Sequence, residues 1–172
     1  MRKPNTITQL IILWVMAVLF VCCGQSKKKS LFFLEKAKGL GEIITKQASA
    51  NMSLCKMYNT VWEYAKVTNL DFKSAFREMM LDTSGIEMQM ETNNQMIGRM
   101  MDMVKSPPKN MNGIYDKLIE LRASYLEFNK FIFQLPQVSQ EKFNAKADAY
   151  LTNINSLKAE LDRLIAEAEA NL

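Results

Sequence analysis

The sequence predicts an all-α fold, an antiparallel four-helix bundle with long helices. Apolar residues recur in alternating steps of three and four over residues 34–65, 72–104, 111–135 and 143–168, a spacing that keeps side chains on one face of a helix. Only 6 glycines and 4 prolines occur among 172 residues, which argues against a loop-rich or β-rich chain. Short breaks separate the four stretches, so neighbouring helices are expected to run antiparallel.

An N-terminal segment precedes the first of these helices. Arg2 and Lys3 are followed by an apolar run of about 14 residues that ends at Cys22 and Cys23. A membrane-spanning helix needs about 20 apolar residues, whereas a signal peptide carries a run of about 7–15. The pattern therefore predicts a bacterial lipoprotein signal peptide over residues 1–23 that ends at a lipidated cysteine.

Two cysteines compete for the lipid. Cys22 has Leu19 three residues before it but bulky Val21 directly before it, whereas Cys23 follows the small Cys22. Because the residue before the cut occupies the tighter position, the sequence favours Cys23. An uncleaved N-terminal anchor and a signal cut by an ordinary peptidase stay open as alternatives. We expect a protein of the bacterial cell envelope that is lipid-anchored and faces outside the cytoplasm.

A flexible tether is expected at residues 24–30, and the bundle domain at 31–172. Lys27, Lys28 and Lys29 lie in the tether, where they could attract anionic lipid headgroups or serve as a hydrated spacer. The mature chain carries 20 basic and 18 acidic residues, because residues 1–22 hold two of the 22 basic residues and no acid. A net charge of +2 is too weak for a nucleic-acid-binding surface, so no nucleic-acid partner is expected.

The first helix presents a continuous buried face in this prediction. Its members are Leu34, Ala37, Gly41, Ile44, Ala48, Asn51, Cys55, Tyr58, Trp62 and Ala65. Thr68 and Asp71 have the spacing of a capping box and predict a turn before the second helix. Ser84 repeats that spacing with Glu87 beside Gly85, so the second helix is expected to bend or restart there.

Prolines mark the ends of the later helices. Ser106, Pro107 and Pro108 stop the second helix, with Ser106 as a cap and Pro107 in the first turn of the third helix. Pro136 ends the third helix, and Ser139 is expected to cap the fourth.

A set of landmarks runs along the bundle region from about residue 52 to residue 144. They are Trp62, Asp71-Phe72, Ala75, Pro107-Pro108, Tyr115-Asp116-Lys117-Leu118, Pro136 and Phe143-Asn144. In this order the chain resembles small uncharacterised all-helical bacterial lipoproteins. It departs from their pattern at Met111, in place of an aromatic residue, and at Ile114, in place of a small one. The resemblance implies the fold and an envelope location, and it transfers no functional residue.

No catalytic site and no cofactor are predicted. The chain has no histidine, which excludes Ser-His and Cys-His nucleophiles and the Glu-x-x-His iron sites of helical bundles. No Asp or Glu falls on the four predicted faces, so the acids are expected on solvated surfaces. Cys55 lies on a predicted buried face, which favours an inert thiol.

Methionine is the unusual residue of this sequence, with 13 copies. Soft thioethers suit Cu(I), and Met96, Met100 and Met103 share one helix face, so a copper carrier is one interpretation. Methionine also fills gaps in cores and makes adaptable binding surfaces. We favour that second interpretation and predict no metal site.

The predicted function follows from these exclusions. We expect a membrane-anchored helical bundle that acts as a protein-binding module or scaffold, with a small-molecule or metal carrier as the alternative. The expected partner surface consists of methionines and phenylalanines outside or beside the predicted faces, although the phenylalanines could instead widen the core. These residues are Met88, Met96, Met103, Phe131 and Phe133.

Overall fold

The computed structural model describes the backbone of residues 6–80 and 83–172, and the side chains within these ranges from residue 27 onward. These residues form the helices α1 (Thr6–Thr68), α2 (Phe72–Glu78), α3 (Ser84–Val104), α4 (Asn112–Phe133) and α5 (Gln140–Ala170). No strand occurs in the described part of the chain, and the prediction of an all-α fold is confirmed. The side chains of the predicted signal peptide, including those of Cys22 and Cys23, are not among the side chains that the structure describes.

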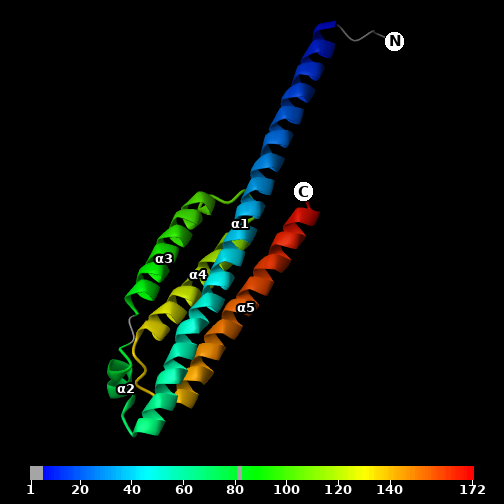
Figure 1. Cartoon of the computed structure of the whole chain (residues 1–172). Coiled ribbons are helices and arrows are strands. Elements are labelled where there is room, and N and C mark those ends of the chain that lie inside the picture. The colour runs from blue at the N-terminus through cyan, green and yellow to red at the C-terminus, as the bar shows by residue number, and fades with distance from the viewer. Residues whose placement is uncertain (1–5, 81–82) are drawn as a thin grey trace.

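The four longer helices alternate in direction, as Figure 1 shows. α1, α4 and α5 pack against one another, whereas α3 packs against α1 and α4, and α2 packs against α1. The helical body therefore has two ends. We name the end that holds Lys29 and Pro108 the N-proximal end, and the end that holds Trp62 and Phe143 the distal end.

The helix faces predicted from periodicity form the core. All ten members of the first predicted face are buried along α1. The third face is buried from Met111 to Ile132, and its last member, Leu135, is exposed because α4 ends at Phe133. The core thus follows the three-and-four spacing, since this spacing returns side chains to the same side of a helix.

The second predicted helix is divided into α2 and α3. α3 begins at Ser84, where the sequence predicts a restart. Met80 has a φ of 48°, a left-handed conformation that side chains adopt rarely and that ends a right-handed helix. α2 is left with a small core of its own, in which Ala75 packs with Val61 and Ala65 of α1.

The predicted cap of α2 is correct at one of its two residues. The carboxylate of Asp71 accepts a hydrogen bond from the backbone N–H of Ser74 at 3.0 Å, which satisfies a free donor of the first turn. Thr68 has no part in this cap, because its hydroxyl donates back to the carbonyl oxygen of Tyr64 inside α1.

The predicted start of α4 is wrong, whereas the predicted cap of α5 is confirmed. α4 begins only at Asn112, so Ser106 and Pro107 lie in the connection and the predicted role of Pro107 in a first helical turn is wrong. Asn110, at a φ of 73°, reverses the chain just before the helix, a conformation that asparagine tolerates. Ser139 caps α5 as predicted.

The segment predicted as a tether is helical. α1 runs through residues 24–30 without a break, and Ser30 is buried. Lysine is a good helix former, and the core contact of Phe33 and Leu34 holds the turn that precedes them. A search of the described residues finds no helical stretch that is both long and apolar enough to cross a membrane.

Candidate functional site

Large side chains fill the space between the helices. Tyr125, Phe128, Phe143 and Leu118 are fully enclosed. The larger hollows found among the described residues open to solvent. A binding site on this part of the protein is therefore expected at the surface and not along the axis of the bundle.

A layer of amide side chains crosses the core. The Nδ2 of Asn51 on α1 donates to the Oδ1 of Asn129 on α4 at 2.7 Å, and both residues are buried. The Nδ2 of Asn129 donates in turn to the Oδ1 of Asn94 on α3 at 3.1 Å. Buried amides form these bonds only when the helices are correctly aligned, so the layer fixes the alignment of three helices. Neutral amides transfer no protons, and the layer is structural.

Tyr125 lies beside this amide layer. Its hydroxyl is buried without a hydrogen-bond partner among the described residues. Burial raises the pKa of Tyr125, while the amides of Asn129 and Asn51 lower it by a smaller amount. The hydroxyl is therefore protonated at neutral pH and cannot act as a base.

Cys55 is a packing residue, as its place on a predicted face indicates. Its side chain is 2% exposed, and burial, together with the negative charge of Asp148, raises the pKa of the thiol to about 11. Because the thiolate is the reactive form, this thiol is a poor nucleophile at neutral pH.

The methionines considered for copper differ in their environments. Met100 packs against the core, whereas Met96 and Met103 are 39% and 57% exposed. A search of the described residues finds no group of three His, Cys, Asp or Glu side chains placed to hold a metal ion.

The predicted partner surface is split between separate parts of the molecule. Met88, Met96 and Met103 are exposed along α3. Phe131 instead packs against α5, where its ring stacks on Phe143 with the ring centroids 4.9 Å apart. α3 and α5 do not pack against each other, so Phe131 does not share one surface with the three methionines of α3.

Phe133 has a third environment. It is partly buried against the core and lines a groove of about 420 Å³ between α3 and α4, with Glu87 and Glu91 on the α3 side. Tyr115 also packs against the core. The interpretation of these aromatic residues as a widened core therefore fits their placement.

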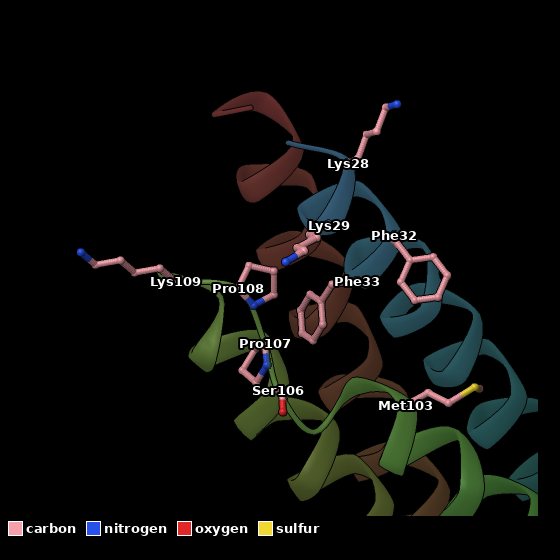
Figure 2. A pocket seen from close by; sticks show the side chains of 9 residues that line it. All are labelled: Lys28, Lys29, Phe32, Phe33, Met103, Ser106, Pro107, Pro108 and Lys109. Atoms are coloured by element: carbon pink, nitrogen blue, oxygen red, sulfur yellow. The ribbon is translucent and has the colours of Figure 1, made fainter. Parts of the chain in front are cut away.

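A groove of about 570 Å³ lies at the N-proximal end, between residues 28–33 of α1 and the connection from α3 to α4. Figure 2 shows Phe33 between α1 and Pro107, Lys29 pointing toward Pro108, and Lys28 and Lys109 extending outward. Lys28 and Lys29 belong to the lysine run recognised in the sequence, whereas Lys109 does not. Because neighbouring helices of the predicted fold run antiparallel, the connection after the second helix returns to the end where the first helix begins. The predicted fold could therefore have placed Lys109 near Lys28 and Lys29.

Comparisons of the chain with protein-family models, curated proteins and solved structures found no match.

Proposed function

We propose that this protein is a lipoprotein of the bacterial cell envelope, anchored through lipid on Cys23 or Cys22, and that its antiparallel four-helix bundle binds another protein. The observation that carries this proposal is the row of exposed methionines on α3. Met88, Met96 and Met103 are 71%, 39% and 57% exposed. We name these three residues the methionine row.

The spacing of the methionine row suits a helical partner. Its members are eight and seven residues apart, close to two helical turns, so they share one side of α3 along about 22 Å. A second helix that lies along this side would meet one methionine in every two turns. Unbranched thioether side chains adapt to the shape of a partner, which makes them effective contact residues.

The alternative of a carrier has less support. A carrier needs a cavity between helices, and large core side chains fill that space here. An enzymatic role has less support still. Among the described residues the buried polar side chains are Ser30, Asn51 and Asn129, and burial raises the pKa of the Cys55 thiol and of the Tyr125 hydroxyl, which keeps both protonated at neutral pH. We therefore propose a non-catalytic module without a cofactor.

Site-specific crosslinking tests the protein-binding proposal. A photoreactive amino acid is placed at Met96 in the full chain, in the bacterium that makes it, and at exposed Ala149 on α5 as the matched control. We expect one dominant protein adduct from Met96 and none from Ala149, and we expect Met88→Glu with Met103→Glu to abolish it. Equal adducts at both positions, or none at Met96, would remove the methionine row as the partner surface.

Lipid labelling tests the anchor. Cells fed a labelled fatty acid should label the wild-type protein, and Cys23→Ser should abolish the label while Cys22→Ser keeps it. Mass spectrometry of the N-terminal peptide identifies the modified residue directly. An unlabelled protein that keeps residues 1–23 and stays in the membrane fraction would show an uncleaved helix anchor instead, because one acyl chain or none holds a protein only weakly.

A further inference from the structure

We propose that the groove at the N-proximal end binds the headgroup of an anionic phospholipid in the membrane that holds the anchor. This inference rests on the proposed lipid anchor for its location. It assigns a second membrane contact, distinct from the lipid on the cysteine, in a groove that shares Met103 with the methionine row.

The charge of the groove is the first argument. Its lining includes Lys28, Lys29 and Lys109 and no acidic residue. Within the part of the chain that the structure describes, no ion pair or hydrogen bond holds any of these three ammonium groups. Two of them come from α1 and one from the α3–α4 connection, so the fold gathers cations that are about 80 residues apart in the sequence. Three lysines without an ion partner among the described residues around one groove give it a positive potential that attracts a phosphate group.

Apolar surface beside the lysines is the second argument. Phe32 is 53% exposed and Met103 57% exposed, and both line the groove. Figure 2 shows them on the same side of it. A phospholipid presents a phosphate next to hydrocarbon, and this combination of lysines with an exposed aromatic ring matches that order.

The position of the groove is the third argument. Lys29 follows Cys23 by six residues inside one helix, which corresponds to about 9 Å along the helix axis. A lipid on Cys23 would therefore hold the groove within reach of the headgroups. Lysines that close to an anionic leaflet gain about a fivefold preference each.

A hollow of similar volume at the distal end provides a natural control. It measures about 600 Å³ and is lined by Phe131, Phe143 and a single lysine, Lys146. The ammonium of Lys146 lies 5.0 Å from the centre of the Phe131 ring, so this cation already has a partner. The two hollows therefore have similar volumes and differ in their lysines. Three lysines without an interaction partner among the described residues line the N-proximal groove, whereas the lysine of the distal hollow contacts an aromatic ring.

The test measures the acylation rate of each lysine in the full chain reconstituted in vesicles, by brief treatment with acetic anhydride and mass spectrometry. The vesicles contain phosphatidylcholine, with or without added phosphatidylglycerol. We expect phosphatidylglycerol to slow acylation of Lys28, Lys29 and Lys109 about fivefold. Exposed Lys105, which lies outside the groove at the same end, and Lys146 at the distal end should change much less. Lys28→Gln with Lys109→Gln should remove the protection of Lys29.

Each other outcome has a separate meaning. Equal slowing of Lys105 and Lys109 would show simple closeness to the membrane, and unchanged rates at Lys109 would show no lipid contact; either result overturns the groove proposal. Protection by inorganic phosphate without vesicles, at the same strength, would replace the lipid with a soluble anion and overturn it as well. Loss of the protein from the vesicles contradicts the anchor. Phosphatidylglycerol vesicles are then added to the released protein: slower acylation of Lys29 and Lys109 than of Lys105 would still support the groove, and unchanged rates would overturn it.

Discussion

The two ends of the helical body are filled in different ways. At the distal end, aromatic rings from α1, α2, α4 and α5 contact one another, with the Trp62 and Phe72 centroids 4.6 Å apart and those of Tyr58 and Phe143 5.7 Å apart. At the N-proximal end, Phe33 is the buried aromatic residue that lines the groove, and it lies beside lysines and prolines. Both ends therefore belong to the core, but the distal end packs through aromatic rings, whereas the N-proximal end packs mainly through aliphatic side chains and carries a lysine-lined groove.

The largest expected effect comes from removing a ring at the distal end. Phe143→Ala should lower the free energy of unfolding by about 3–5 kcal/mol, because it leaves a cavity among rings that cannot close around it. Phe33→Ala should cost about 1–2 kcal/mol less, since Phe143 contacts the rings of Tyr58, Trp62 and Phe131 whereas no ring contact of Phe33 occurs among the described residues. Urea denaturation followed by circular dichroism measures both. Equal losses would contradict the contrast between the two ends.

The amide layer lies between the two ends and is the next target. Asn129→Ala should cost about 1–3 kcal/mol, because it leaves the buried amide of Asn51 without its partner. Replacing both Asn51 and Asn129 by Leu should recover part of that loss, since it leaves no unpaired amide at this pair. The same urea measurement applies to both variants. A double variant that is less stable than Asn129→Ala would show that the layer contributes more than the pairing of its amides.

Two nearby glycines of α1, Gly39 and Gly41, form a matched pair with smaller effects. A Cβ at Gly41 would lie 2.7 Å from the Cδ2 of Leu161 on α5, whereas a Cβ at Gly39 would meet nothing within 4 Å. Gly39→Ala should raise the free energy of unfolding by about 0.5–1 kcal/mol through helix propensity. Gly41→Ala should lose that gain to overpacking, which costs about 1–3 kcal/mol. Thermal unfolding of the two variants decides this, and a gain in both would mean that α5 moves aside at little cost.

A further expected effect is the dependence of stability on alkaline pH. Burial raises the pKa of Cys55 from 9.0 to about 11 and that of Tyr58 to about 12. The unfolded chain therefore releases the Cys55 proton first, so the folded state should lose stability as the pH rises from 9 to 11 and keep it below pH 9. Urea curves across this range measure the loss. Cys55→Ala should lose less over the same range, and an equal loss would exclude the thiol as its source.

Much of the fold was predictable because periodicity is a local property. The positions from Leu34 to Ala65 recur every three or four residues, and a helix must return them to one side, so their burial did not depend on the neighbouring helices. The cap at Ser139 and the restart at Ser84 were predictable for the same reason. The lipidation of Cys22 or Cys23 and the binding of a protein partner are sequence-based predictions of another kind, which the proposed labelling and crosslinking test.

The candidate sites depended on the tertiary structure. Phe131 and Met96 are both apolar residues near a predicted face, and only the placement of α5 shows that Phe131 packs on Phe143 while Met96 is exposed. The sequence by itself determined the side of each long helix that faces the core, because the backbone hydrogen bonds set the helical repeat. The exact buried residues depended on packing: Ile165 is buried in α5, whereas the predicted Leu164 is only half-buried. Only the tertiary structure decided that Lys29 and Lys109 line one groove, because convergence of distant residues depends on how the helices pack and where their connections turn.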